Sequence, residues 1–196
     1  ISITLHRSGT SRTQQVDTTT TGLDLFGSDR AVVAMRVDGN LVDLQRELHD
    51  GAEVEPVEAT SEDGLNIIRH SATHVMAQAV QQLYPEVNLG IGPFITDGFY
   101  YDFGNIEPVT PEVLSELEKR MKRIVKENQR FVRRVTTEES AREELADQPY
   151  KLELIGTKGK GAEGASVEVG GGELTIYDNV HRNGEVAWKD LCRGPH

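Results

Sequence analysis

The sequence contains a single cysteine, Cys192, among its 196 residues, so no disulfide can form within the chain. One free thiol is typical of proteins from reducing compartments, and it favours a cytoplasmic protein. The sequence also lacks the run of about 20 apolar residues that a membrane-spanning helix requires. A secretion signal begins with a positively charged segment that is followed by an apolar one, and the first residues of this sequence show no such pattern. We therefore expect no membrane partner.

Positive charge is also scarce, because 21 Lys and Arg residues stand against 32 Asp and Glu residues, for a formal net charge of -11. Affinity for phosphate backbones comes from clustered Lys and Arg, so this composition excludes a protein that binds nucleic acid over its whole surface. Hydrophobic residues make up 37% and charged residues 27%, which is ordinary for a folded domain. The length allows one large domain or two small ones.

The first 59 residues alternate short apolar runs with turn signals at Ser8-Gly9 and Asp38-Gly39. The expected elements are a hairpin over residues 1–16, a short helix near 23–26, and strands at 31–37, around Leu41 and ending near Val57. Four or five short strands with one short helix are typical of a small β-grasp, or ubiquitin-like, fold. We therefore predict a β-grasp domain over residues 1–59.

Residues 60–196 mix helical and strand patterns and predict a second domain, which makes the whole chain α+β. A long amphipathic helix is expected from Asp63, its N-cap, to the residue before Pro85. Two more helices are expected, one starting at Thr110-Pro111 and one capped by Thr136 and Glu139, with strands at 89–91, 98–103, 151–155, 173–177 and 185–190. We expect the long helix to pack on a mostly antiparallel sheet, and the glycine-rich stretch 156–172 to form a mobile loop.

Two residue pairs have the side chains of catalytic or metal sites. His70 and His74 are four residues apart on the long helix, so their imidazoles project from the same side. Cys192 and His196 are also four residues apart, next to the turn signal of Gly194-Pro195. Three imidazoles and one thiolate suit tetrahedral zinc, or zinc with an open position if one stays away. The plain alternative is solvated or hydrogen-bonded histidines, with Cys192 as a small buried apolar residue and His196 on the surface.

Several stretches of the second domain stand in a recognisable order and spacing. They are RHSATH at 69–74, GIGP at 90–93, GFYYD at 98–102, YKLE at 150–153 and DLCRGPH at 190–196. These stretches resemble the editing domain of bacterial threonyl-tRNA synthetases, and residues 1–59 resemble the β-grasp (TGS-like) domain that precedes it there. Alanyl-tRNA synthetase editing domains share the two residue pairs, but GFYYD and the leading β-grasp domain favour the threonyl family. The resemblance implies a tRNA editing domain over residues 60–196.

The resemblance implies a hydrolase that removes wrongly attached serine from tRNA(Thr), next to the rest of the synthetase in a longer protein. Serine lacks one methyl group of threonine, and a methyl group in a pocket is worth about 1–3 kcal/mol, which is too little for high fidelity without a second, hydrolytic step. The chain begins without methionine and stops at His196, the last residue of the Cys-x-x-x-His pattern, so we expect that both ends were cut or are not represented. We recognise no aminoacylation domain, and we expect the chain by itself to be monomeric.

The resemblance also implies roles for individual residues in ester hydrolysis. His70 or His74 would orient and deprotonate water, and Lys151 would stabilise negative charge or protonate the leaving ribose oxygen. Asp190 would fix Lys151 or the ammonium group of the substrate. The full set of expected catalytic residues is His70, His74, Lys151, Asp190, Cys192 and His196.

Two more residues, Tyr101 and Gly92, are expected to bind the substrate. Tyr101 could contact the terminal adenosine or the seryl group, and the alternative is a half-buried aromatic residue of a sheet. The chain departs from the family at Ala72, where some relatives carry cysteine, so a thiol there is not needed for the chemistry. The glycine-rich stretch makes the spacing from Lys151 to Cys192 longer than in other members, which bears on the assignment of Lys151.

The sequence leaves open whether the chemistry uses a metal cofactor. A metal-free mechanism requires no cofactor, whereas zinc held by the two pairs would supply a metal-bound hydroxide. We favour the metal-free mechanism. A different class of protein, a noncatalytic and zinc-stabilised RNA-binding module, would use the same four residues as a structural site.

One basic stretch interrupts the acidic composition. It is expected to begin on the second helix, to continue to Arg134, and to include Arg120, Arg123 and Lys126 as tRNA contacts. The alternative is a solvated helix face with local ion pairs.

Overall fold

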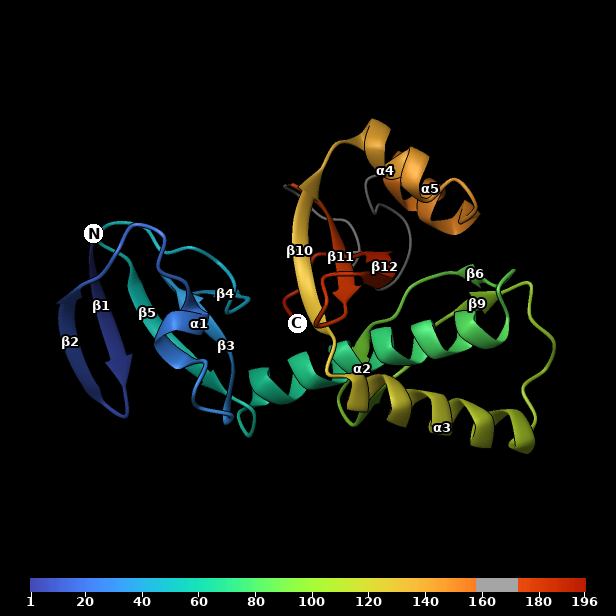
Figure 1. Ribbon diagram of the computed structural model, residues 1–196, viewed down its shortest axis with the longest axis horizontal. Coiled ribbons are helices and arrows are strands. Elements are labelled where there is room, and N and C mark those ends of the chain that lie inside the picture. Colours follow the sequence, from blue (N-terminus) through green and yellow to red (C-terminus); the bar gives the residue numbers. More distant parts are fainter. Residues whose placement is uncertain (158–172) are drawn as a thin grey trace. The chain divides into compact units, whose positions relative to one another are not determined.

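The computed structural model describes residues 1–157 and 173–196 (Figure 1). Most of the predicted glycine-rich loop, residues 158–172, lies outside the described residues. By its contacts the chain divides into two units, residues 1–69 with 194–196 and residues 70–193. Helices and several sheets occur together, consistent with the expected α+β class. Over the described ranges, no helix is long and apolar enough to cross a membrane.

The first unit contains one five-stranded sheet and one short helix. Its elements are β1 (Ser2–Arg7), β2 (Thr10–Gln15), α1 (Gly22–Phe26), β3 (Val32–Val37), β4 (Asn40–Val42) and β5 (Glu53–Glu58). The strand order is β2-β1-β5-β3-β4, with β1 and β5 parallel and the other pairs antiparallel. Ile3, Phe26 and Met35 lie in its core. The hairpin, the short helix and the strands expected from the sequence are confirmed.

Helix α2 (Glu62–Leu83) starts slightly earlier than its sequence pattern predicts. Ser61 Oγ accepts a hydrogen bond from the backbone amide three residues further on, as an N-cap does. The prediction of Asp63 as the cap is wrong, because Asp63 already lies in the first turn. Leu65 and Ile68 are exposed, so the expected apolar stripe is buried only further along the helix.

The second unit is built around a three-stranded antiparallel sheet. Its remaining elements are β6 (Asn88–Leu89), β7 (Phe94–Ile95), β8 (Gly98–Phe99), β9 (Phe103–Gly104), α3 (Pro111–Glu127), β10 (Arg130–Thr136), α4 (Glu138–Glu144), α5 (Pro149–Thr157), β11 (Leu174–Val180) and β12 (Val186–Leu191). The order of the larger sheet is β10-β11-β12. Trp188 on one face packs with Ala77 and Val80 of α2, while Ile176 on the other packs with Leu154 of α5. The expected packing of the long helix on an antiparallel sheet is found.

Helix α3 begins at Pro111 after its cap, Thr110, as predicted. It buries Leu117 and Ile124 in the same core as α2, and Figure 1 shows the two helices side by side. The expectation that this basic helix continues to Arg134 is wrong. Asn128 adopts a left-handed conformation (φ 52°) that ends the helix, and the remaining basic residues lie on β10.

Three other sequence expectations are wrong in detail. Residues 151–155, expected as a strand, lie in α5, which starts at Pro149, a residue that favours the first helical turn. The cap of α4 is Thr137, whose Oγ accepts from Ser140 N at 3.2 Å, because Thr136 still pairs in β10. The single strand expected over residues 98–103 is interrupted, because β8 ends at Phe99 and β9 begins at Phe103; β8 pairs with β7, and β9 pairs with β6.

Candidate functional site

The candidate site lies where α2 faces the larger sheet of the second unit. Residues four apart on a helix share a face, which brings His70 and His74 to one side of α2. Residues two apart on a strand share a face, and Trp188 and Asp190 of β12 are related in this way to Cys192, which directly follows the strand. The spacing of four on the helix and of two on the strand therefore brings these groups together.

Cys192 and His70 form a buried polar contact. Cys192 Sγ lies 3.3 Å from His70 Nε2, and neither residue is more than 3% exposed. The backbone N–H of Cys192 donates to Thr175 O at 3.2 Å, which continues the pairing of β11 and β12 past the end of the strand. The alternative of Cys192 as a purely apolar residue is therefore incomplete, since its sulfur meets an imidazole nitrogen.

His74 lies among aromatic rings at the centre of the site. Its ring meets those of Trp188 at 5.5 Å and Phe131 at 6.2 Å, both nearly perpendicular, and that of His70 at 5.3 Å. Burial lowers the pKa of His74 well below its ordinary value of 6.5, and the charges of His70 and Lys151 lower this pKa further. His74 is therefore a neutral imidazole near pH 7.

Asp190 and Lys151 form an ion pair in the protein interior. Lys151 Nζ lies 3.0 Å from Asp190 Oδ1, with both side chains fully buried. Tyr101 donates its hydroxyl to Asp190 Oδ2 at 2.6 Å, and the backbone N–H of Leu191 donates to Asp190 Oδ1 at 2.8 Å. Lys151 Nζ also lies 5.5 Å from the centre of the Tyr101 ring. The carboxylate is thus fixed by three donors, one of them a cation.

Gly92 and Tyr101, the two residues expected to bind substrate, lie against each other. A Cβ atom added to Gly92 would come within 2.4 Å of the Tyr101 ring, so only glycine fits here. The Thr73 hydroxyl lies 3.1 Å from Gly92 O, which connects this segment to α2. Tyr101 also stacks on Phe103 at 4.8 Å and is only 7% exposed. Its position directly supports Asp190, and any contact with substrate stays a prediction.

The expected metal ligands also occur as a group. His70, His74 and Cys192 offer ligand atoms within 4.8 Å of one another, and the same group of candidate ligands includes His196. His196 belongs by its contacts to the first unit, where its backbone N–H donates to Asp43 Oδ1 at 2.8 Å. Imidazole nitrogen and thiolate are donors that zinc prefers, so the residues of this group fit that ion.

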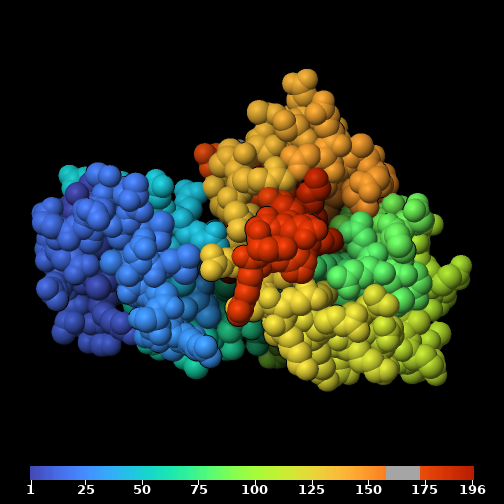
Figure 2. Space-filling view, in the orientation of Figure 1, coloured from blue at the N-terminus to red at the C-terminus, as the bar shows by residue number. Residues whose placement is uncertain are grey.

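The predicted tRNA-contacting residues lie on α3, whose surface is yellow in Figure 2. Arg120 pairs with Glu116 at 3.0 Å, as expected for a solvated helix face with local ion pairs. Arg123 and Lys126 are exposed, and in the described part of the chain no acidic group lies within ion-pair distance of them. The structure therefore leaves these two cations available to an anionic partner.

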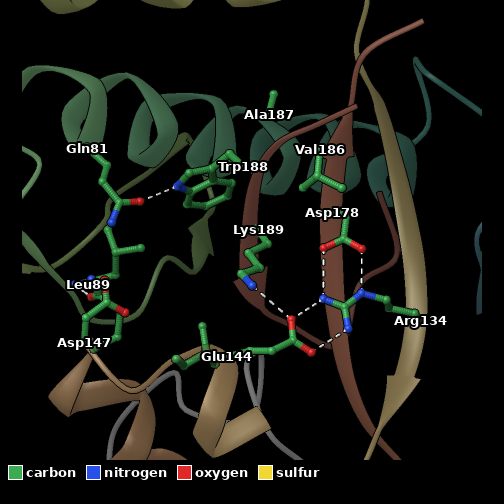
Figure 3. A pocket seen from close by; sticks show the side chains of 12 residues that line it. Gln81, Leu89, Arg134, Glu144, Asp147, Asp178, Val186, Ala187, Trp188 and Lys189 are labelled. Atoms are coloured by element: carbon green, nitrogen blue, oxygen red, sulfur yellow. Dashed lines mark hydrogen bonds and ion pairs between the residues drawn. The ribbon is translucent and has the colours of Figure 1, made fainter. Parts of the chain in front are cut away.

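A pocket of about 610 Å³ opens beside β12 (Figure 3). On one wall Arg134 donates to Asp178 at 2.6 Å and to Glu144 at 2.9 Å, and Lys189 donates to Glu144 at 3.0 Å. The hydrogen bonds from Arg134 lower the pKa of Glu144 to about 2. Trp188 forms another part of the lining. The charges of this wall are mutually paired, so the network links β10, β11, β12 and α4.

Sequence reasoning missed four residues beside His74, which are Gln78, Phe131, Asn179 and Trp188. One signal was available, because Gln78 follows His70 and His74 at the same interval of four. The residues on the sheet gave no such signal, because β10 was not expected and the register of its neighbours cannot be read from one sequence.

The fold and the site define an α+β protein with catalytic residue types clustered in its interior. No protein-family model matches the chain. The threonine–tRNA ligase of Streptomyces avermitilis is 59% identical over 199 aligned positions, which cover 100% of this chain and 30% of the relative. That of Streptomyces griseus is 62% identical over 184 positions (92% and 28%), and that of Micrococcus luteus is 59% identical over 181 positions (90% and 27%). The chain belongs to the bacterial threonine–tRNA ligase family and spans about 30% of the length of these curated relatives.

Proposed function

We propose that this chain is the editing part of a threonine–tRNA ligase and hydrolyses the ester of mischarged Ser-tRNA(Thr). In this proposal residues 1–59 are its β-grasp domain and residues 60–196 its editing domain, acting in the cytoplasm. The observation that supports it is a set of five ionisable side chains that share the interior of the second unit. Each is at most 3% exposed, and they are His70, His74, Lys151, Asp190 and Cys192. Ionisable groups are costly to bury, and such clusters are typical of catalytic sites.

The neutral state of His74 supports a role as general base. A neutral imidazole can accept a proton from water, which makes the water oxygen a better nucleophile towards the seryl carbonyl. His70 is the alternative base, and its Nε2 contact with Cys192 would restrain its orientation. In either case, a bond forms between the water oxygen and the seryl carbonyl carbon as a proton of the water moves to the imidazole.

The charge of Lys151 supports a role in stabilising the oxyanion. Negative charge develops on the carbonyl oxygen in the tetrahedral intermediate, and a cation inside a dry site stabilises it more strongly than in water. When the intermediate collapses, the ester bond to the ribose breaks and the ribose oxygen takes up a proton, from the imidazolium or from Lys151. Asp190 would hold Lys151 in place throughout.

Zinc is compatible with the donor set and is not required by this scheme. His70, His74 and Cys192, with His196, are the residues that would hold it. A bound zinc ion would lower the pKa of a coordinated water to about 7. The same group supports a second candidate function, a noncatalytic RNA-binding module in which zinc stabilises the fold.

We also propose that the tRNA approaches over α3. Arg123 and Lys126 would contact phosphates, while Arg120 would contribute less because Glu116 neutralises it. The rest of the synthetase would supply the other tRNA contacts.

A deacylation assay tests the proposed function. The purified chain is mixed with Ser-tRNA(Thr) or Thr-tRNA(Thr), and the release of free amino acid is followed. We expect hydrolysis of the seryl ester and little hydrolysis of the threonyl ester, because the extra methyl group should clash in a pocket shaped for serine. Equal rates for both esters would reject the editing function. Stoichiometric metal together with no hydrolysis would favour the RNA-binding module.

A further inference from the structure

A row of three side chains across the sheet lies beside His74. Phe131 on β10, Asn179 on β11 and Trp188 on β12 stand directly opposite one another in the strand register. Both rings at the ends of this row meet the His74 imidazole nearly at right angles. The pairing of β11 and β12 becomes irregular next to Asn179, and such bulges often re-aim side chains near active sites. Whatever fixes this row therefore helps to fix His74.

Two glutamines of α2 hold the row by side-chain hydrogen bonds. Gln78, one turn beyond His74, accepts from Asn179 Nδ2 at 2.8 Å. Gln81 accepts from the indole N–H of Trp188 at 2.7 Å, as Figure 3 shows. These bonds join residues that are 101 and 107 positions apart in the sequence. The helix that carries His74 is thus tied directly to the strands that carry its neighbours.

Stability alone does not explain the inner pair. Gln78 and Asn179 are each only 1% exposed. Among the residues that the structure describes, Gln78 Nε2 and Asn179 Oδ1 have no hydrogen-bond partner in the protein. Buried polar atoms without a partner destabilise a fold, and apolar side chains of similar size would avoid this cost. A residue that costs stability and fixes the geometry beside a buried histidine fits a role in positioning.

We propose that Gln78 and Gln81 are positioning residues for His74, acting through Asn179 and Trp188. The catalytic consequence rests on the proposed editing function, whereas the clamp itself rests on the geometry above. Loss of either amide should let the row shift and the imidazole turn. Because catalysis depends on the placement of reacting groups within about 1 Å, the turnover rate should fall more than substrate affinity.

The first test compares Gln78→Leu and Gln81→Leu with Gln82→Leu, a matched control at an exposed position of the same helix. We expect kcat for Ser-tRNA(Thr) to fall about tenfold or more in the first two variants, with KM within about twofold of the wild type. The control should keep the wild-type kcat. The double variant Gln78→Leu/Asn179→Leu removes both buried amides, so its thermal midpoint should equal or exceed that of the wild type, which a merely structural role would not produce.

Gln81→Glu provides a conservative rescue, because it keeps an oxygen that can accept from Trp188. Gln81→Glu should retain most of the wild-type kcat. Because Gln81 is only half-buried, the comparison of Gln81→Leu with Gln81→Glu tests the positioning role even if Gln78→Leu does not fold. Wild-type kcat in both leucine variants, or an equal loss in Gln82→Leu, would overturn the proposal.

A second readout does not depend on catalysis. The His74 ring protons lie close to two aromatic rings, so their NMR shifts report the placement of Trp188. Trp188 is the single tryptophan of the chain, so its fluorescence reports the same site. Gln81→Leu should move both signals, and Gln82→Leu should move neither. If the wild-type chain does not deacylate, the editing function fails while these signals still decide the clamp, and unmoved signals in Gln81→Leu would refute it.

Discussion

Lys151 Nζ lies 3.0 Å from Asp190 Oδ1 in a part of the second unit where both side chains are fully removed from solvent. Desolvation offsets most of the attraction in such a pair, so an apolar pair of similar size would be about as stable. Tyr101 and the Leu191 amide complete the hydrogen bonding of the carboxylate. A buried pair with little net benefit to stability is better explained by chemistry that needs a fixed cation.

The first prediction separates the pair's stability from its chemistry. Lys151→Met leaves the Asp190 carboxylate buried and unpaired, so we expect the free energy of unfolding to fall by about 3–5 kcal/mol. Combining Lys151→Met with Asp190→Leu removes both charges and should recover much of that loss. Neither variant should hydrolyse Ser-tRNA(Thr). Urea unfolding and deacylation assays measure the two effects.

Lys122→Met is the surface control for this comparison, because Lys122 pairs with Glu118 at 2.6 Å in an exposed position. Its unfolding free energy should change by less than about 1 kcal/mol. A folded double variant that deacylates at the wild-type rate would remove Lys151 and Asp190 from the catalytic set.

The second prediction concerns His74. His74→Phe keeps a ring between Trp188 and Phe131 but removes both nitrogens, so the fold should remain stable while deacylation falls by about 10² or more, as loss of a general base typically does. Circular dichroism and a thermal melt would establish folding. A phenylalanine variant with the wild-type rate would leave His70 as the base.

The third prediction addresses zinc. In the metal-free scheme, a chelator should leave both deacylation and the thermal midpoint unchanged, and metal analysis should find much less than one zinc per chain. If zinc is structural, its removal should lower the thermal midpoint strongly, because binding energy at such a site contributes directly to folding. One tightly held zinc per chain would redirect the mechanism to the metal-bound hydroxide.

Much of the fold could be predicted from local signals in the sequence. The hairpin at Ser8-Gly9 and the start of α3 at Thr110 each depend on turn or capping chemistry within a few residues. Strand β10 was missed because its basic residues were assigned to the preceding helix. The end of that helix depends on the left-handed backbone of Asn128, for which the sequence alone gives only a weak signal.

The site shows the same division between local and distant relationships. His70 and His74 could be paired from their spacing on one helix, and Cys192 and His196 from the same spacing beside the turn signal of Gly194-Pro195. The contact of Lys151 with Asp190 could not be derived from spacing, since residues 151–155 form a helix and not the expected strand. Side-chain bonds between residues over 100 positions apart, such as that of Gln81 with Trp188, require the strand register.

The fourth prediction tests the tRNA path. Replacing both Arg123 and Lys126 by Gln should weaken tRNA binding and reduce the slope of log affinity against log salt by about 1 to 2, since each phosphate contact contributes about 0.7 to 0.9. Lys122→Gln is the matched control, because its charge is already paired with Glu118. Binding measured at several salt concentrations gives the slope. An unchanged slope in the double variant would reject α3 as the route.

The last prediction uses the ion-pair network in the pocket wall. Hydrogen bonds from Arg134, aided by Lys189, lower the pKa of Glu144 to about 2 from its ordinary value of 4.5. Because the folded pKa is the lower one, the unfolded chain takes up the proton first as the solution is acidified. The stabilisation by the Glu144 carboxylate is complete above about pH 4.5 and is lost as the pH falls towards 2. Glu144→Gln should therefore lower the unfolding free energy most at neutral pH. The difference in unfolding free energy between this variant and the wild type should shrink as the pH falls from about 4.5 towards 2. Glu143→Gln, at the exposed neighbouring position, is the control. Urea unfolding between pH 7 and pH 2.5 measures the difference, and a gap that stays constant with pH would contradict the assigned shift.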